Sequence, residues 1–238
     1  MIAVVYRDRH LLVVDKPSGL PTTAPGEGDC LVRRVRAIDP GAERLHPTSR
    51  LDAEVTGLVT FARTRHATVA LQNARQRQAY RRRYLALTPP PRKSSGRWDE
   101  PIALDLRDRR RRRVGDGPGS KRAATRWWCL ATAGPLALLA LEPETGRTHQ
   151  LRVHASHAGL PIAGDRIYGG NGRVTLPDGR VLSARRTMLH CAGLRLPLVK
   201  HELVSEPPED FMRLWERVGG DAPIARRALS PSPAASAR

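Results

Sequence analysis

The sequence has 238 residues, of which 40% are hydrophobic, and this is enough for one sizeable domain with a packed core. Its 41 Lys and Arg residues outnumber its 23 Asp and Glu residues, so the formal net charge is +18. This charge favours a polyanionic partner such as nucleic acid, and the absence of any long apolar run excludes an integral membrane protein. A genome rich in arginine codons could raise the arginine content, but it would not cluster the arginines.

The three cysteines are far apart and odd in number, and no spacing of Cys and His residues resembles a zinc site. The first residues contain no basic stretch followed by an apolar segment, as a signal peptide would. We therefore expect a soluble cytoplasmic protein with no membrane partner, acting as a monomer.

The first part of the chain predicts alternating strands and helices: a hairpin with strands at 3–6 and 11–16, a helix over 30–38, a strand over 57–63, a helix over 64–78 and a strand over 81–87. In the first helix, Leu31, Val35 and Ile38 share one face. Thr64 is placed to cap the second helix.

The later part predicts two strands over 127–132 and 136–143, a helix capped by Thr148, a strand pair over 187–196 and 201–206, and a terminal helix after Pro207 and Pro208. From Gly219 onward the content of Ala, Ser, Pro and Arg cannot bury much surface. We therefore expect a mixed α/β domain over 1–218 and a disordered tail over 219–238.

A basic run interrupts this pattern between two predicted strands. Residues 107–122 read RDRRRRRVGDGPGSKR and contain five consecutive arginines. Such a run is often only a solvated loop, but here a folded scaffold would project it, and we favour contact with phosphates. The candidate RNA-binding residues in and near it are Arg109, Arg110, Arg111, Arg112, Arg113 and Lys121.

The segment ETGRTHQLRVHASHAGLPIAGD, residues 144–165, predicts a short helix that ends at Gly159. Two of its histidines, His149 and His154, are better explained as capping or packed residues than as metal ligands, because no third ligand is nearby. We expect no metal and no cofactor.

Several blocks together resemble the RluA-type RNA pseudouridine synthases: SRLDAEVTG, HLLVVDKPSGL, RRRYLAL, KRAATRWW, LEPETGRTHQLRVHASHAGLPIAGDRIYG and MLHCAGLRLPL. They lie in the family's order between about residue 2 and residue 205. The resemblance implies that Asp52 is the catalytic aspartate, Tyr84 the active-site aromatic residue and Arg152 the arginine that pairs with the aspartate. The sequence departs from the family pattern at Ser49, where a histidine is usual, and at Val55 and Thr56, where Thr-Ser is usual.

The resemblance also implies a pseudouridine synthase fold, which is a mixed, largely antiparallel sheet in two halves with a central cleft and flanking helices. Many members carry an S4 RNA-binding domain, and we expect none here. The implied substrate is a uridine in structured ribosomal or transfer RNA. Arg50 would hold or fill the space left by the flipped nucleotide, and Arg147 and His149 would also contact RNA.

The residues suit this chemistry without reference to the family. A carboxylate beside the sugar can attack C1′ or C6, or stabilise the sugar cation that forms when the N1 to C1′ bond breaks, and these routes remain open. A nearby arginine favours the ionised carboxylate and orients it. Tyr84 offers a flat face for the uracil ring and a hydroxyl that can relay a proton.

Two other functions compete with this interpretation. The first is a non-catalytic RNA-binding protein that keeps the fold. The second is a glycoside hydrolase that uses Asp52 and Glu54, but carboxylates two residues apart tend to point to different sides, and the positive charge suits no neutral sugar. Taken alone, Asp52 could also be only a turn residue before the strand.

Overall fold

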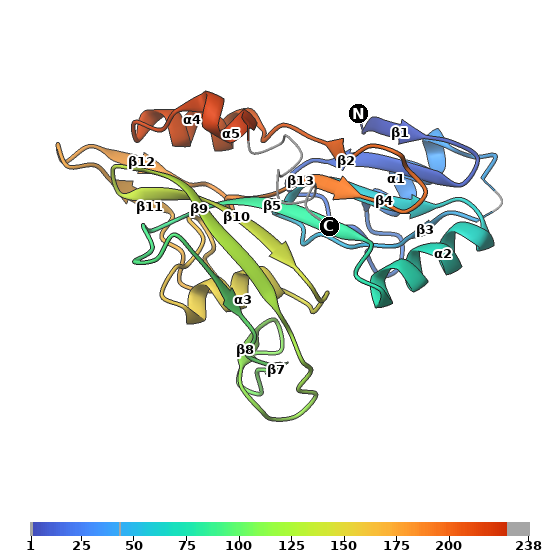
Figure 1. The fold of residues 1–238 in the computed structure, drawn as a ribbon, viewed down its shortest axis with the longest axis horizontal. Coiled ribbons are helices and arrows are strands. Elements are labelled where there is room, and N and C mark those ends of the chain that lie inside the picture. Colours follow the sequence, from blue (N-terminus) through green and yellow to red (C-terminus); the bar gives the residue numbers. More distant parts are fainter. Residues whose placement is uncertain (1, 43, 228–238) are drawn as a thin grey trace. The chain divides into compact units, whose positions relative to one another are not determined.

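The computed structural model describes residues 2–42 and 44–227, which form two compact units of mixed α/β structure (Figure 1). The first unit consists of Met1–Arg82 and His190–Pro207, and the second of Arg83–Leu189 and Pro208–Arg238. Strand pairing in both units is mostly antiparallel, as the sequence predicts.

The sheet of the first unit has the order β1 (Ala3–Arg7), β2 (Leu11–Lys16), β4 (Thr56–Ala62) and β13 (Leu189–Arg195), with β3 (His46–Pro47) paired to β4 and β14 (Leu203–Val204) paired to β13. The predicted hairpin, buried strand and late strand pair are thus confirmed. Only the β4–β13 pair among these is parallel, and it joins Gly57 to Cys191. Gly57 has φ 107°, and an added Cβ would lie 2.3 Å from the Cys191 carbonyl oxygen. The close approach of β13 therefore requires glycine there.

Two helices belong to the first unit, α1 (Leu31–Ile38) and α2 (Arg65–Gln76). The side chain of Thr64 accepts a hydrogen bond from the Ala67 backbone N–H, which confirms the predicted cap of α2. In α1, Leu31 and Val35 are buried, whereas Ile38, in the last turn, is 39% exposed.

The second unit is built on the antiparallel order β5 (Arg81–Thr88), β10 (Leu136–Pro143), β9 (Thr125–Ala133) and β6 (Ser95–Trp98). Two small hairpins accompany it, β7 (Ile102–Leu104) with β8 (Arg112–Val114), and β11 (Arg173–Thr175) with β12 (Val181–Ser183). The long apolar strands were predicted. The short strands were not, because three or four residues carry too little periodicity to be read.

Three helices follow in the second unit: α3 (Gln150–His157), α4 (Glu209–Arg217) and α5 (Ala222–Arg227). Helix α4 confirms the predicted terminal helix, and it buries Phe211, Leu214 and Trp215. Helix α5 lies inside the stretch for which composition predicts disorder, so the structure differs from the prediction there. The remainder of that stretch, 228–238, lies outside the described residues. None of the described helices has the length and apolar character needed to cross a bilayer.

The predicted cap of α3 at Thr148 is wrong. His149 occupies the N-cap position with φ 57°, and the helix begins at Gln150. The Gln150 side-chain oxygen accepts hydrogen bonds from the Arg147 backbone N–H at 3.0 Å and from the Thr145 hydroxyl at 2.6 Å. Because this amide organises the turn before the helix, no hydroxyl cap is needed.

Candidate functional site

Asp52 opens a tight turn that leads into β4 of the first unit. The Val55 backbone N–H donates to the Asp52 carbonyl oxygen at 3.1 Å, and Asp52 itself is half-buried. The turn is therefore a regular hydrogen-bonded one, and it places Asp52 at the edge of the core.

A buried lysine holds this turn through hydrogen bonds. Lys16, at the end of β2, is fully buried, and its ammonium donates to the carbonyl oxygens of Pro17 and Leu20 at 2.8 Å and of Ala53 at 2.9 Å. The Gly19 backbone N–H also donates to the Ala53 carbonyl at 2.9 Å. These bonds tie the PSGL loop to the residue directly after Asp52.

A second clamp acts on the residue before Asp52. The Thr22 hydroxyl donates to the Leu51 carbonyl at 2.8 Å and accepts from the Leu51 backbone N–H at 3.0 Å. Both side chains are buried. Asp52 is thus flanked on each side by a residue whose backbone is fixed by a buried side chain.

The residues that depart from the family pattern have structural partners in the first unit. Ser49 is buried, and its hydroxyl accepts from the Thr60 backbone N–H at 3.4 Å. The Thr56 hydroxyl lies 2.9 Å from Nδ1 of His190, whose Nε2 lies 3.0 Å from the Ser205 carbonyl oxygen. The departures therefore support the strand that carries the Asp52 turn.

Arg152 and Tyr84, the other predicted catalytic residues, belong to the second unit. Arg152 is buried in α3, and its Nε and Nη2 donate to the two carboxylate oxygens of Asp165 at 2.7 and 2.8 Å. Asp165 is completely buried. This bidentate pair fixes the plane of the guanidinium group. Tyr84 lies on β5, opposite Leu141 of β10, and is 4% exposed.

Tyr168 connects this arginine to the basic hairpin. Its ring lies under the Arg152 guanidinium, with 5.1 Å between Cζ and the ring centroid. Its hydroxyl accepts from the Arg112 backbone N–H at 2.8 Å and lies 2.8 Å from Nδ1 of His149. One side chain therefore joins β8, the start of α3 and the buried ion pair.

An apolar cluster supports the same junction. Ile102 of β7 and Val153 of α3 pack with Ala123 and Tyr168, and Val114 of β8 covers them. Figure 1 shows the β7–β8 hairpin beyond α3, at the far end of this unit. The hairpin is consequently anchored to the helix that carries Arg152.

Of the five predicted arginines, Arg112 and Arg113 begin β8 and the other three precede it in the connecting turn; all except the half-buried Arg112 are exposed. Asp108 pairs with Arg110 at 2.9 Å, and the hydrogen bond from Arg110 lowers the pKa of Asp108 to about 2. The Arg112 and Arg113 guanidinium groups also donate to nearby carbonyls. The run is thus part of a folded hairpin and not a loose tail.

The other predicted RNA-binding residues are divided between the units. Arg50 is exposed in the first unit. In the second unit Lys121 and Arg147 are exposed, and Arg147 Nε donates to the Arg122 carbonyl at 2.9 Å. His149 is half-buried against Tyr168.

His154 is a packed residue, as the sequence predicts. Its Nδ1 lies 3.0 Å from the Thr125 hydroxyl and its Nε2 lies 3.0 Å from the Glu100 carbonyl oxygen. Burial lowers its pKa below the ordinary 6.5, so the ring is neutral near pH 7. Within the described part of the chain, no group of three or more His, Cys, Asp or Glu side chains is placed to hold a metal ion.

Comparison with known proteins shows the family of the chain. A family model described as RNA pseudouridylate synthase matches residues 10–157. The ribosomal large subunit pseudouridine synthase D of Xanthomonas campestris is 34% identical, over 94% of this chain and 72% of its own. The dual-specificity RNA pseudouridine synthase RluA of Escherichia coli is 33% identical, over 88% of this chain and 94% of its own.

Solved structures show the same fold. Human RNA pseudouridylate synthase domain containing 1 aligns with a TM-score of 0.73 at 25% identity, covering 98% of this chain and 96% of its own. Human RNA pseudouridylate synthase domain containing 4 aligns with a TM-score of 0.71 at 25% identity, covering 91% and 93%. With the motif blocks and the family match, these likenesses establish that the chain belongs to the RluA-type RNA pseudouridine synthases.

Proposed function

We propose that this isomerase converts uridine to pseudouridine in ribosomal or transfer RNA with Asp52 as its catalytic carboxylate. The observation that carries the proposal is the double clamp on the Asp52 turn by Lys16 and Thr22. A carboxylate whose backbone is fixed on both sides keeps its position while the substrate base detaches, rotates and rejoins.

Tyr84 and Arg152 complete the proposed catalytic set. Tyr84 stacks on the uracil ring and relays a proton when C5 rearomatises. Arg152 stabilises the negative charge of Asp52, and Asp165 keeps the guanidinium in the orientation that this requires. Asp165 is therefore a positioning residue.

The basic hairpin is proposed as the RNA clamp. Arg109, Arg110, Arg111 and Arg113 contact phosphates, and Arg50, Lys121, Arg147 and His149 contact the RNA closer to the target nucleotide, which is flipped out of its stack. The hydrogen bond of Arg112 to Tyr168 supports a link between this clamp and α3.

The names of the relatives support ribosomal RNA as one substrate, because one of them is a ribosomal large subunit enzyme. The proposal also places the active protein in the cytoplasm as a monomer, with residues 1–218 as the catalytic domain. Mapping pseudouridines in ribosomal and transfer RNA from a strain that lacks this protein identifies the modified position.

The variant Asp52→Asn tests the catalytic assignment. The amide has the same shape but is neither nucleophilic nor basic, so tritium release from RNA labelled at C5 of uridine should be lost while RNA binding is kept. Substantial release by this variant would remove Asp52 from the reaction. RNA binding by a parent protein that releases no tritium from any RNA would instead favour the non-catalytic alternative.

A further inference from the structure

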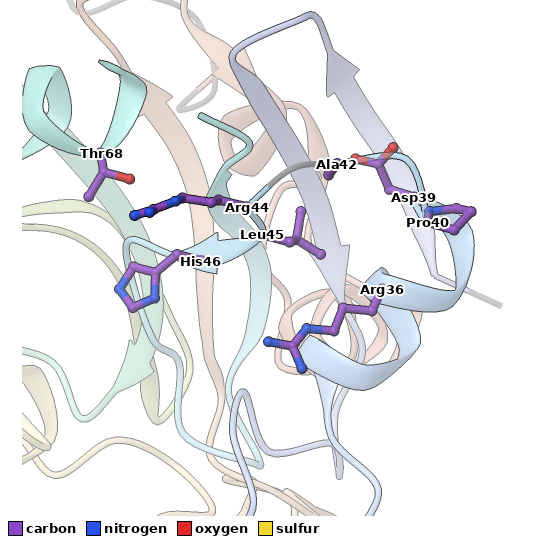
Figure 2. Close-up of a pocket in the computed structure, with 8 residues that line it drawn as sticks. All are labelled: Arg36, Asp39, Pro40, Ala42, Arg44, Leu45, His46 and Thr68. Atoms are coloured by element: carbon purple, nitrogen blue, oxygen red, sulfur yellow. The ribbon is translucent and has the colours of Figure 1, made fainter. Parts of the chain in front are cut away.

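A pocket in the first unit has no part in the proposed chemistry. It has a volume of about 730 Å³ and lies between the end of α1, strand β3 and the first turns of α2 (Figure 2). Pro40, Ala42 and Leu45 supply apolar lining, and Arg36, Arg44 and His46 supply polar and cationic lining. Arg36, Arg44 and His46 are exposed, so their side chains are accessible to a ligand.

The charge of the pocket is positive. Asp39 is the only acid among its described lining residues, and the Asp39 side chain is 1% exposed. Both Asp39 carboxylate oxygens accept from Arg63, through Nε at 2.7 Å and Nη2 at 3.0 Å, and Arg7 adds a second cation. Because two arginines outside the lining neutralise this acid, Arg36 and Arg44 leave a net positive surface.

The two helix ends at the pocket have opposite electrostatic effects on a bound anion. The carbonyl end of α1 disfavours an anion, but Arg36 lies in its last turn and offsets that effect. Thr68 lies near the N-terminal end of α2, which favours an anion. An anionic group is therefore best placed on the side of Arg44 and Thr68, and Figure 2 shows the Arg44 side chain extending toward Thr68.

This combination of surfaces suits a nucleotide better than an inorganic anion. Ligand pockets usually have volumes of about 300–1,000 Å³, and a simple phosphate needs no apolar wall. A guanidinium fork matches a phosphate, while an imidazole ring and an aliphatic side chain can cover a base. The pocket contains both kinds of group side by side.

The position along the chain connects the pocket to the Asp52 turn. His46 precedes Asp52 by six residues in the same unit. Even a fully extended chain spans at most about 3.6 Å per residue, so their Cα atoms lie within about 22 Å of each other. One RNA strand can therefore reach both places.

We propose that this pocket binds a nucleotide of the RNA substrate other than the one that is isomerised. Its phosphate lies on Arg44, its base lies against Leu45 and His46, and Arg36 contacts the phosphate of an adjacent nucleotide. The inference rests on the proposed function, because it takes RNA as the substrate. It adds a contact with the RNA outside the catalytic residues.

The phosphate contacts are tested with the double variant Arg36→Gln and Arg44→Gln. The matched control is the double variant Arg65→Gln and Arg77→Gln, which removes two exposed arginines of the α2 segment that do not line the pocket. Binding to transcripts of a large-subunit ribosomal RNA and of a transfer RNA is measured over a range of salt concentrations. The slope of log K against log salt should fall by about 1.4–1.8 in the pocket variant, for two lost phosphate contacts. An equal change in the control, or none in the pocket variant, would overturn the proposal.

The nucleotide part is tested without a change of charge by Ala42→Phe, which fills the apolar side of the pocket. RNA containing 4-thiouridine should crosslink to Leu45 or His46 in the parent, and this crosslink should be lost in the variant together with affinity. If the RNA crosslinks to other residues of the parent protein but never to Leu45 or His46, the proposal is contradicted, even if the variant fails to fold. Displacement of the crosslink by a free nucleoside monophosphate at low concentration would assign the pocket to a small molecule instead.

These measurements are separate from the test of catalysis. Single-turnover tritium release at saturating RNA should match the parent in the pocket variants, because none of the changed residues belongs to the proposed catalytic set. If the parent protein releases no tritium, the proposed function fails, but crosslinking and salt dependence still decide whether the pocket holds a nucleotide.

Discussion

Arg152 and Asp165 form a bidentate ion pair in which the two side chains are 6% and 0% exposed. Asp165 also accepts from the backbone N–H groups of Ile167 and Tyr168, both at 3.3 Å. The carboxylate thus links the guanidinium of α3 to the turn that follows it. An arginine proposed for catalysis is held by an acid of its own unit.

The first prediction concerns this pair. Asp165→Asn removes the buried bidentate acceptor of Arg152, so the free energy of unfolding should fall by about 3–5 kcal/mol, and tritium release should fall at saturating RNA. Asp178→Asn is the control, because its pair with Arg180 is exposed and should contribute much less to stability. Equal urea midpoints for the two variants would show that Asp165 does not hold Arg152.

The second prediction concerns Lys16, which holds the Asp52 turn through hydrogen bonds. Lys16→Met keeps most of the side-chain volume but removes the donor to three carbonyl oxygens, and the loss at the buried Leu20 carbonyl should cost about 1–3 kcal/mol. Because Ala53 is one of these acceptors, the turnover rate should fall while RNA affinity stays the same. Lys93→Met, at an exposed lysine, should change neither. A stable Lys16→Met variant with the parent turnover rate would show that the clamp is not needed for catalysis.

The sequence predicted most of the core elements because their patterns are long. The apolar run of β4 and the helical spacing of Ala67, Leu71 and Ala74 can be read from the residues alone. The site was predicted by resemblance at Asp52, Tyr84 and Arg152. The sequence reading missed Lys16, Asp165 and Tyr168, although each lies in a motif block. Asp165 pairs with Arg152, 13 residues away, and Lys16 with Ala53, 37 residues away, and contacts at such separations leave no local pattern. Their signal was a charged or polar residue inside an otherwise apolar block.

The third prediction concerns pH. The pKa of His154 is lowered in the folded protein by burial, so below about pH 6.5 the unfolded chain takes up a proton that the folded chain does not. The contribution of this residue is therefore present above its unfolded pKa and decreases as the pH falls through that value. The difference in unfolding free energy between the parent and His154→Gln should shrink from pH 7.5 to pH 5.5. A difference that stays constant over this pH range would contradict the assignment.

The fourth prediction separates the two roles of Tyr168. Tyr168→Phe removes the acceptor of the Arg112 backbone N–H and the partner of His149, but keeps the ring under Arg152. RNA binding should weaken because the hairpin loses its hydrogen bond to Tyr168 and keeps only the apolar packing, while turnover at saturating RNA should stay close to that of the parent. Tyr168→Leu also removes the ring and should lower turnover as well. The same loss of turnover in both variants would show that the hydroxyl, and not the ring, supports Arg152.

The fifth prediction concerns the basic hairpin itself. Replacing Arg109, Arg110, Arg111 and Arg113 with serine leaves the backbone bond of Arg112 to Tyr168 in place. Each lost phosphate contact should reduce the slope of log K against log salt by about 0.9 for duplex RNA treated like B-form DNA, or by about 0.7 for a single strand. Single-turnover tritium release at saturating RNA should survive, because the substituted side chains are not in the proposed catalytic set.

The matched control for the hairpin removes four exposed arginines elsewhere in the second unit: Arg166, Arg173, Arg180 and Arg185. It changes the net charge by the same amount, so a general effect of charge would alter both slopes equally. A smaller change in the control assigns the phosphate contacts to the hairpin. If the hairpin variant instead loses turnover with unchanged binding, the arginines act on the geometry of α3 through the packing of Val114 and Ile102 against Val153, and the separation of RNA clamp from catalytic core is wrong.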